Sequence, residues 1–422
     1  MCIDESNKFI ILRCYFENVN MPRVLRIINR FNLGGPTYNA AYLSRYMPTD
    51  YQTLLVGGVK EPDEESSVYI VKNLGITPII IPEMKRQINA HDDLVAYRKI
   101  AKIIRDFKPD IVHTHASKAG TVGRLAAIRN KVPVILHTFH GHVFHSYFNN
   151  SQTKFYVNIE RGLAQRTSRI IAISEKQREE LCDIFKIAPP DKFSVIPLGF
   201  DLQRFTEDKE LRRIEFRRHY NIDDDEIAIA IVGRLAAVKN HKLFIDAIAA
   251  VKQQVNSKIR AFIIGDGELK TELQNQCNQL GLSFVNTSEN QINKADVTFT
   301  SWIKNVETAY PGIDIVAMTS LNEGTPVSLI EAQAACVPIV TTNVGGIENV
   351  VAQGDTAILA KNNNLEDFVA KLKMVVEDTA LRTQMTANGW TFVKDKFHYT
   401  RLISDMDNLY RELLANTKKR KH

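Results

Sequence analysis

The sequence lacks the features that mark membrane-spanning, secreted and disulfide-stabilised proteins. Its 422 residues contain no apolar run of 18 residues, and residues 1–20 are polar and charged apart from a short run at 9–12. We therefore expect neither a transmembrane helix nor a secretory signal. The five cysteines include no Cys-x-x-Cys pair, which favours free thiols in a reducing compartment. These absences indicate a cytoplasmic protein.

The composition is that of an ordinary globular protein, with 44% hydrophobic and 24% charged residues. It excludes disorder and collagen-like repeats, and the length predicts two or three domains. The net charge of +6 is uneven, because residues 1–200 hold 27 Lys and Arg against 19 Asp and Glu, and residues 201–422 hold 27 against 29. Two readings stay open for the basic half, an anionic partner or charges scattered over solvated faces.

Short β-branched runs alternate with helical stretches along the whole chain. They lie at 23–29, 52–56, 77–81, 110–115, 132–138, 169–173 and 193–197, and then at 227–232, 260–264, 282–285, 313–319, 337–341 and 357–359. This alternation predicts an α/β protein with two doubly wound, Rossmann-like parallel sheets. We expect an extension of uncertain order at 1–22, domains at 23–199 and 200–396, and at 397–422 a helix that packs back on the first domain, followed by a basic tail.

The strand-to-helix turn at residues 319–331 offers the richest chemistry. Ligands of such sheets bind at the carboxyl ends of strands, where backbone N–H groups at a helix start bind phosphate. Pro326 is expected at the first helical position, ahead of the N–H group of Val327. Glu323 precedes the helix, and Glu331 lies one turn inside it, where a carboxylate can accept hydrogen bonds from a ribose diol. The alternative, a capped helix with solvated acids, fits Glu-Gly-Thr-Pro poorly.

Three further turns carry glycine at a strand exit. Gly233 is followed by Arg234 and Lys239. The planar guanidinium of Arg234 and the ammonium group of Lys239 suit a diphosphate leaving group. Gly265 belongs to a second turn that permits close backbone approach, and Gly34-Gly35 to a third in the first domain. Because no turn reads Gly-x-Gly-x-x-Gly, we do not expect a dinucleotide site.

Six of the eleven histidines lie between positions 113 and 145. They are His113, His115, His137, His140, His142 and His145. Their spacing matches no standard zinc pattern, so we expect no metal site and assign them to a polar sugar pocket, with His140 in direct contact and others structural. The run Asp223-Asp224-Asp225 is interpreted as a solvated turn and not as a metal chelator.

Together these motifs resemble the retaining glycosyltransferases of family 4, which have the GT-B fold of two Rossmann-like domains facing a central cleft. The resemblance covers about residues 23–410. It rests on Glu-Gly-Thr-Pro-x4-Glu at 323–331, Gly-Arg-Leu-x3-Lys-Asn at 233–240 and Val-Gly-Gly at 344–346. The segment 110–148 is similar to the exopolysaccharide and capsule branch. Cys336, where glycine is commoner, is a departure.

The resemblance implies a role for each candidate residue. Arg234 and Lys239 would bind the donor diphosphate, Glu331 the ribose, and Glu323 the transferred sugar. The donor-binding set would also include Gly233, Gly265, Gly324, Thr325 and Val327, with Gly35 and His140 facing the site from the first domain. Glu323, Arg234, Lys239 and His140 would form the catalytic set.

The implied reaction transfers a sugar, with retention of configuration and without a metal or other cofactor, from a nucleotide-sugar to an acceptor. UDP-sugar is the expected donor, with the neighbourhood of Trp302 near its base, and a lipid-diphosphate-linked saccharide the expected acceptor. A peripheral contact of the basic domain with the inner membrane face is compatible with this, and no nucleic-acid partner is expected. A nucleotide-sugar 2-epimerase and a non-catalytic sugar-nucleotide-binding protein stay open as alternatives.

Overall fold

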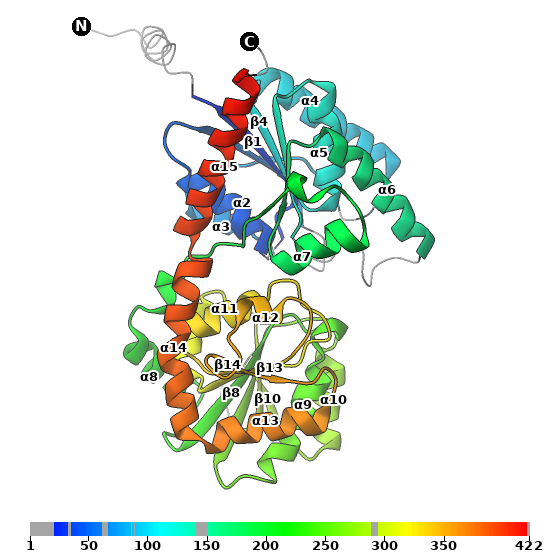
Figure 1. Cartoon of the computed structure of the whole chain (residues 1–422). Helices are drawn as coiled ribbons and strands as arrows, with labels where there is room; N and C mark the ends of the chain where they lie inside the picture. The colour runs from blue at the N-terminus through cyan, green and yellow to red at the C-terminus, as the bar shows by residue number, and fades with distance from the viewer. Residues whose placement is uncertain are drawn as a thin grey trace, which may run out of the picture. The chain divides into compact units, whose positions relative to one another are not determined.

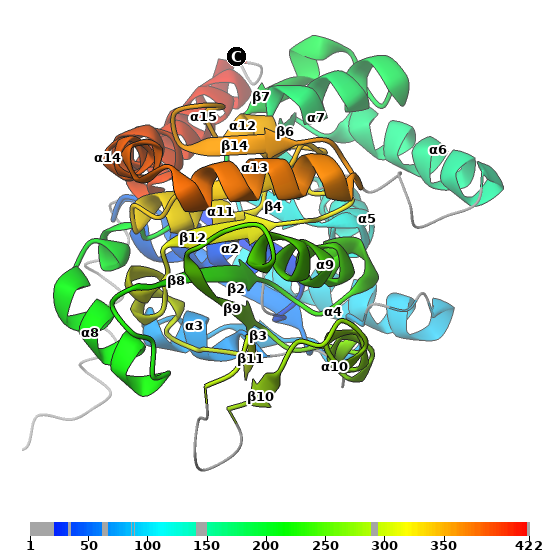
Figure 2. The same ribbon diagram turned by 90° about the horizontal axis from the view of Figure 1, so that it is seen from below.

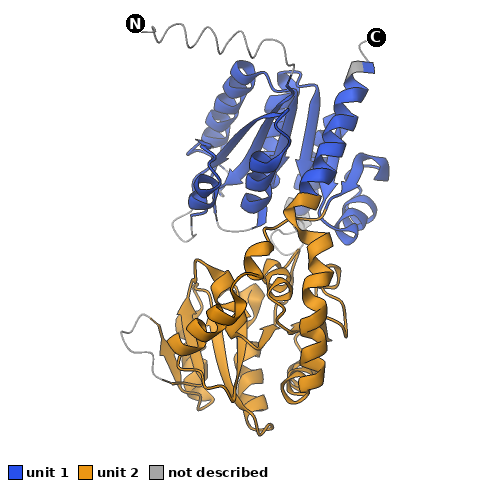
Figure 3. Cartoon of the chain, turned by 90° about the vertical axis from the view of Figure 1, so that its left-hand side faces the viewer, with its two compact units in different colours: residues 1–196, 402–422 blue, residues 197–401 orange. Residues whose placement is uncertain are grey.

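The computed structural model describes residues 21–32, 35–60, 66–85, 87, 89–140, 150–287 and 294–419. Residues 1–20 of the extension predicted at 1–22, Gly34, His142, His145 and the last three residues of the basic tail lie outside the described residues. The chain divides into two compact units, Met1–Ile196 with Leu402–His422 and Pro197–Arg401 (Figure 3).

A parallel seven-stranded sheet forms the centre of the first unit, in the order β3-β2-β1-β4-β5-β6-β7. Its strands are β1 (Arg23–Arg30), β2 (Gln52–Gly58), β3 (Ile79–Ile80), β4 (Ile111–His115), β5 (Val134–Thr138), β6 (Arg169–Ala172) and β7 (Phe193–Val195). Each corresponds to one of the β-branched runs in the first half of the sequence. The central strands are buried on both faces, as parallel sheets covered by helices are.

Helices cover both faces of this sheet (Figure 1). The helices of the unit are α2 (Gly35–Tyr46), α3 (Val68–Asn73), α4 (Ala90–Phe107), α5 (Ser117–Arg129), α6 (Asn150–Arg166), α7 (Glu175–Glu179) and most of α15 (Tyr399–Lys419). On one face α4 and α5 pack on Leu25 and Ile27 of β1. On the other, α2 and α15 pack on Val24, with Leu402 and Met406 of α15 fully buried. The apolar stripe of α15 therefore completes the core of the first unit.

The second unit repeats the architecture around a parallel sheet in the order β10-β11-β9-β8-β12-β13-β14. The strands are β8 (Glu226–Val232), β9 (Lys258–Ile264), β10 (Phe284–Asn286), β11 (Val297–Ser301), β12 (Ile315–Met318), β13 (Ile339–Thr342) and β14 (Ala357–Ala360). The sequence analysis missed β11, which reads Val-Thr-Phe-Thr-Ser. Its Thr298 and Thr300 are buried, and the Thr300 hydroxyl donates to the Ile263 carbonyl at 3.3 Å, so threonine serves here as a core residue.

The helices of the second unit are α8 (Lys209–His219), α9 (His241–Lys252), α10 (Lys270–Gln279), α11 (Val327–Ala334), α12 (Ile347–Val350), α13 (Leu365–Glu377) and α14 (Thr379–Phe397). One face of the sheet is covered by α9, α10 and α13, of which α9 and α13 lie side by side (Figure 2). Phe244 of α9 and Phe368 of α13 are fully buried there. The side chain of Asn364 accepts from the backbone of α13 and that of Asp378 from the backbone of α14, which fixes where these helices begin.

The strand order changes direction between β1 and β4 in the first unit and between β8 and β12 in the second, where it also changes direction at β11. Loops that leave neighbouring parallel strands at such a point diverge and leave room for a ligand. In the second unit these are the loops that follow β8 and β12, which contain Arg234, Lys239 and Glu323.

Candidate active site

The loops after β8 and β12 are joined by hydrogen bonds. The Leu321 N–H donates to the Val238 carbonyl at 2.8 Å, and the Thr319 hydroxyl donates to the Asn240 carbonyl at 2.9 Å. Both donors lie directly after β12, and both acceptors lie in the turn that precedes α9. These hydrogen bonds hold the two loops together and so fix the side chains that the loops carry.

Lys239 and Glu323 form an ion pair between these two loops, with 2.5 Å between Nζ and Oε1. The Ser320 hydroxyl donates to the same carboxylate oxygen at 2.6 Å. Ser320 is itself held, because the Thr342 hydroxyl donates to its carbonyl at 2.6 Å. The Glu323 side chain is only 10% exposed and that of Lys239 25%. The structure thus brings together two of the predicted catalytic side chains in a partly shielded place.

Gly345 and Gly346 let the backbone of the Glu323–Gly324 segment approach closely. A Cβ atom on Gly345 would lie 2.0 Å from the Glu323 carbonyl oxygen, and one on Gly346 would lie 1.9 Å from that of Gly324. Gly345 also has a φ of +56°, in the region that favours glycine. The Gly346 N–H donates to the Glu323 carbonyl at 2.8 Å, so the Val-Gly-Gly motif supports the loop that carries Glu323.

Gly233 and Gly265 meet in the same way at the ends of β8 and β9. A Cβ on Gly265 would lie 2.0 Å from the Gly233 carbonyl oxygen, and the Gly233 N–H donates to the Ile264 carbonyl at 2.9 Å. Arg234 follows Gly233, is half-buried, and pairs with Glu268 at 3.1 Å. Partly exposed pairs of this kind contribute little to stability.

Helix α11 begins at Val327, one residue later than expected, and Pro326 precedes it instead of occupying its first position. No side-chain hydrogen bond caps this helix within the part of the chain that the structure describes. Gly324, Thr325 and Val327 are half-buried around its start. The first N–H groups of an α-helix have no partner inside it and attract anions, so the start of α11 suits a phosphate.

Glu331 lies one turn inside α11 and is half-buried, with its side chain 13% exposed. The Tyr310 hydroxyl donates to Glu331 Oε2 at 3.1 Å, and Arg204 Nη2 lies 3.9 Å from Oε1. Burial raises the pKa of Glu331 to about 7, against the opposing effect of Arg204 and the Tyr310 hydrogen bond. The carboxyl group is thus poised to change its charge near neutral pH.

Sequence reasoning missed three residues that support the candidate carboxylates. Ser320 donates to Glu323, whereas Tyr310 and Arg204 contact Glu331 from short 3₁₀ turns at Tyr310–Gly312 and Gln203–Phe205. Such short turns have no periodicity to detect. The one available signal was that Ser320 lies three residues before Glu323, which places the hydroxyl within local reach of the carboxylate.

Three of the candidate histidines, His113, His115 and His140, contact one another. His113, His115 and His137 are fully buried, and His140 is half-buried. His115 Nδ1 lies 2.9 Å from His140 Nε2, whereas His137 Nδ1 lies 2.9 Å from the Thr114 hydroxyl. His140 stands two residues after β5, at the carboxyl edge of the sheet. Gly35, the other candidate from this unit, is the first residue of α2.

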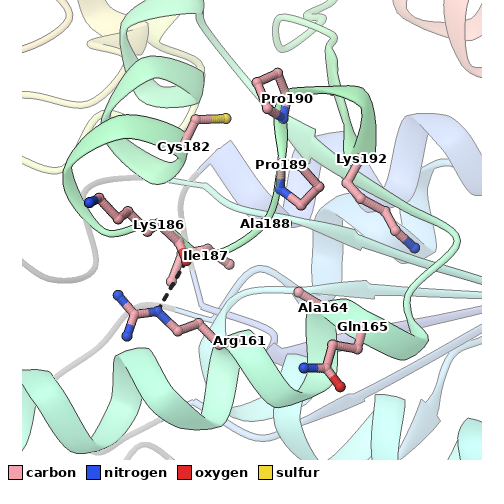
Figure 4. A pocket seen from close by; sticks show the side chains of 10 residues that line it. All are labelled: Arg161, Ala164, Gln165, Cys182, Lys186, Ile187, Ala188, Pro189, Pro190 and Lys192. Carbon is pink, nitrogen blue, oxygen red and sulfur yellow. Dashed lines mark hydrogen bonds between the residues drawn. The ribbon is translucent and has the colours of Figure 1, made fainter.

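A hollow of the first unit lies beside α6 and the segment that precedes β7 (Figure 4). It has a volume of about 620 Å³ and is lined by Arg161, Ala164, Gln165, Cys182, Lys186, Ile187, Ala188, Pro189, Pro190 and Lys192. Three of its lining residues are cationic and none is acidic. Arg161 is fixed by hydrogen bonds to the carbonyls of Phe185 at 2.7 Å and Lys186 at 3.0 Å. The hollow is therefore a positively charged, partly apolar surface.

Among the described residues, no group of three or more His, Cys, Asp and Glu side chains is arranged to hold a metal ion. No described helix is both long enough and apolar enough to cross a bilayer.

Comparison with protein-family models identifies both halves of the chain. Residues 33–204 match the model for Glycosyltransferase Family 4, and residues 212–391 match the model for glycosyl transferases group 1. The chain belongs to the family 4 glycosyltransferases and has their GT-B fold. It is an enzyme that transfers a sugar, as predicted from the sequence.

Relatives of known name agree with this assignment. The chain is 27% identical over 342 residues to the Escherichia coli UDP-Gal:alpha-D-GlcNAc-diphosphoundecaprenol alpha-1,3-galactosyltransferase, covering 81% of this chain and 85% of that one. It is 25% identical over 343 residues to the capsular polysaccharide biosynthesis glycosyltransferase CapM of Staphylococcus aureus, covering 80% and 86%.

Solved structures share the fold. A glycosyltransferase from Rickettsia africae superposes with a TM-score of 0.75 at 18% identity, covering 94% of this chain and 100% of that one. Anabaena Alr3699/HepE, solved in complex with UDP, gives 0.74 at 18% identity, covering 92% and 100%. At such identities the likeness supports the GT-B fold alone.

Proposed function

We propose that the enzyme transfers a sugar from a UDP-sugar to a lipid-diphosphate-linked saccharide, with retention of configuration at the transferred carbon. The observation that carries this proposal is the Lys239–Glu323 pair beside the start of α11, at the point where the second sheet reverses its order. A cation, a carboxylate and backbone N–H groups that can bind phosphate would thus contribute to one donor site.

The leaving diphosphate would be stabilised by fixed charges and dipoles. Negative charge develops on it as the bond to the sugar breaks, and preorganised cations and N–H groups lower the energy of that state. Lys239 is held in place by its pair with Glu323, so little reorganisation is needed. Arg234 would turn from Glu268 toward the diphosphate. In this scheme no residue acts as a covalent nucleophile, and no metal ion is required.

Two carboxylates would hold the two sugars of the donor. Glu331 would accept hydrogen bonds from the ribose hydroxyls, and Glu323 would accept from the transferred sugar. Gly233 and Gly265 would allow close approach of the nucleotide, and Gly324, Thr325 and Val327 would contact the phosphates and sugar. Gly35 of α2 and His140 after β5, the two further donor-binding residues that the resemblance implies, belong to the first unit.

The acceptor proposal draws on the named E. coli relative, whose acceptor is a diphosphoundecaprenol-linked sugar. An acceptor of this kind is anchored in a membrane, and anionic headgroups attract clustered Lys and Arg side chains. We propose that the hollow with Arg161, Lys186 and Lys192 is where the first unit contacts anionic headgroups, as a peripheral membrane protein.

The test is a UDP-release assay with UDP-glucose, UDP-galactose and UDP-N-acetylglucosamine, each with and without a polyprenyl-diphosphate-linked N-acetylglucosamine acceptor. We expect acceptor-dependent release with one donor, and an anomeric coupling in the NMR spectrum of the product that matches the donor. UDP release without a glycosylated product would support an epimerase or hydrolase instead. Inverted configuration would contradict retention, and donor binding without any turnover would contradict the proposed catalysis.

A further inference from the structure

Three short 3₁₀ turns of the second unit bring charged and polar side chains to Glu331 of α11. Arg204 comes from the turn Gln203–Phe205, Glu307 from Val306–Thr308 and Tyr310 from Tyr310–Gly312. The Arg204 guanidinium lies between two carboxyl groups, with Nη2 3.9 Å from Glu331 Oε1 and Nη1 3.6 Å from Glu307 Oε2. The same guanidinium thus serves two acids that are both half-buried.

The hydroxyl group of Tyr310, a fully buried residue, lies beside two oxygen atoms. Its oxygen is 3.1 Å from Glu331 Oε2 and 3.0 Å from the Ser328 carbonyl oxygen. A carbonyl oxygen can only accept, whereas a carboxyl group accepts when it is ionised and can donate when it is protonated. One hydroxyl proton cannot form both hydrogen bonds at full strength, so the charge of Glu331 decides how the two contacts are made.

Each charge state of Glu331 has its own arrangement of protons. When Glu331 is protonated, its O–H donates to the Tyr310 oxygen and the Tyr310 O–H donates to the Ser328 carbonyl, so both contacts are satisfied. When Glu331 is ionised, the Tyr310 O–H donates to it instead, and Arg204 offsets its charge. Ser328 lies inside α11, where a carbonyl can also accept from the helix backbone. Turning one hydroxyl group therefore accommodates both forms.

The surroundings of Glu331 favour the protonated form in the free enzyme below neutral pH. Burial raises the pKa of Glu331 to about 7, and the charge of Glu307 acts in the same direction, whereas Arg204 and the Tyr310 hydrogen bond lower it. Of two further elements packed on α11, β13 consists of Ile, Val and Thr, and α14 approaches at Gly389. Arg204, Glu307 and Tyr310 are therefore the groups through which the charge of Glu331 can be tested.

We propose that Tyr310 and Arg204 are positioning residues for Glu331, through which binding of a uridine nucleotide is coupled to the loss of a proton from Glu331. The inference rests on the proposed function, in which Glu331 accepts hydrogen bonds from the ribose hydroxyls. As these hydroxyls donate to Glu331, its O–H bond breaks and the proton leaves to solvent. At the same time the Tyr310 O–H turns from the Ser328 carbonyl to Glu331 Oε2. Hydrogen bonds to an ionised group favour that form, so the ribose and Tyr310 together stabilise the carboxylate beside Arg204.

Isothermal titration of UDP into the full chain at pH 7, in buffers of different ionisation enthalpy, counts the protons released on binding. A group with a pKa of about 7 is half protonated at that pH, so the natural chain should release about 0.5 proton more than Glu331→Gln. At pH 8.5 the two proteins should release the same number. The comparison cancels any proton that the terminal phosphate of UDP exchanges. Equal release by the two proteins at pH 7 would overturn the inference.

Arg204→Gln and Tyr310→Phe test the two positioning residues by a pH profile. Each substitution removes a group that lowers the pKa of Glu331, so the free variant should keep its proton to higher pH. At pH 8 the natural chain should release about 0.1 proton more than Glu331→Gln, and both variants should release several times that excess. A merely structural role would lower the affinity for UDP or the melting temperature without this upward shift, and that result would overturn the assignment.

Arg218→Gln is the matched control for Arg204→Gln. It makes the same change in net charge at an exposed position of α8. We expect it to release as many protons as the natural chain at both pH 7 and pH 8. A shift equal to that of Arg204→Gln would mean that net charge, and not the contact of Arg204 with Glu331, governs the proton, and would overturn the inference.

The outcome also separates this inference from the proposed function. If the enzyme transfers sugar and binds UDP while the natural chain and Glu331→Gln release equal numbers of protons, the proposed function stands and the inference is wrong. If UDP does not bind to the natural chain at all, both are wrong.

Discussion

The buried carboxyl group of Glu331 should make the stability of the second unit depend on pH. In the unfolded chain this group ionises near its usual pKa of 4.5, and in the folded chain burial raises the pKa to about 7. Its contribution to stability is therefore complete below pH 4.5, falls as the pH rises from 4.5 to 7, and stays constant above 7. The pKa difference corresponds to a loss of about 3 kcal/mol.

Glu331→Gln removes this ionisation and keeps the shape of the side chain. Between pH 4.5 and pH 8, the free energy of unfolding of the variant should therefore gain about 3 kcal/mol relative to the natural chain. For a unit of this size that is a relative rise in melting temperature of about 6–12 °C. Comparing the same two proteins at two pH values cancels the constant loss of the Tyr310 hydrogen bond.

Differential scanning calorimetry of the full chain at several pH values is the assay. Glu215→Gln, the same change at an exposed position of α8, is the control and should follow the natural chain at every pH. Glu331→Gln should also lose affinity for UDP at pH 8, because an amide accepts hydrogen bonds from the ribose less well than a carboxylate does. Parallel stability curves for Glu331→Gln and the natural chain would refute the reasoning.

Three further predictions concern backbone conformation and surface charge. Gly345→Ala places a Cβ 2.0 Å from a backbone carbonyl oxygen, and should lower both turnover and melting temperature more than Gly281→Ala, whose φ of +69° is also positive but whose surroundings are open. Cys336 follows α11 with a φ of +64°, so Cys336→Gly should raise the free energy of unfolding by about 0.5–1 kcal/mol in chemical denaturation. Lys186→Glu should lower the affinity for phosphatidylglycerol vesicles in a co-sedimentation assay by about fivefold to tenfold. Lys102→Glu, at an exposed position of α4, should leave that affinity unchanged. Equal vesicle binding of both variants would contradict the proposed membrane contact.

The strands of both sheets were largely predictable because the signal for a buried strand lies in a few consecutive residues. Apolar β-branched runs between glycine-containing turns identified all seven strands of the first sheet and six of the second. Strand β11 was missed because Thr298 and Thr300 alternate along it, and threonine hydroxyl groups suggest a solvent-exposed strand. Both threonines are buried in the sheet. The Thr300 hydroxyl donates to the Ile263 carbonyl on β9, a partner on another strand that no local sequence pattern contains.

The candidate site was predictable to the extent that it follows strand exits. Lys239 and Glu323 are 84 positions apart, yet both follow strands that flank the reversal point, so their meeting follows from the topology. The setting of Glu331 was not predictable, because Arg204 and Tyr310 reach it from short turns. The pairing of His115 with His140 likewise depends on which neighbouring strands align, a property of the folded sheet.

Isothermal titration of UDP into the full chain tests the central claim, that the nucleotide binds beside Lys239 and the start of α11. We predict that Lys239→Ala weakens UDP binding at least tenfold, since a hydrogen bond to a charged group is lost. Lys242→Ala, which removes an exposed lysine three residues further on that pairs with Glu272, should bind UDP as the natural chain does. Equal affinity of Lys239→Ala and the natural chain for UDP would contradict the account.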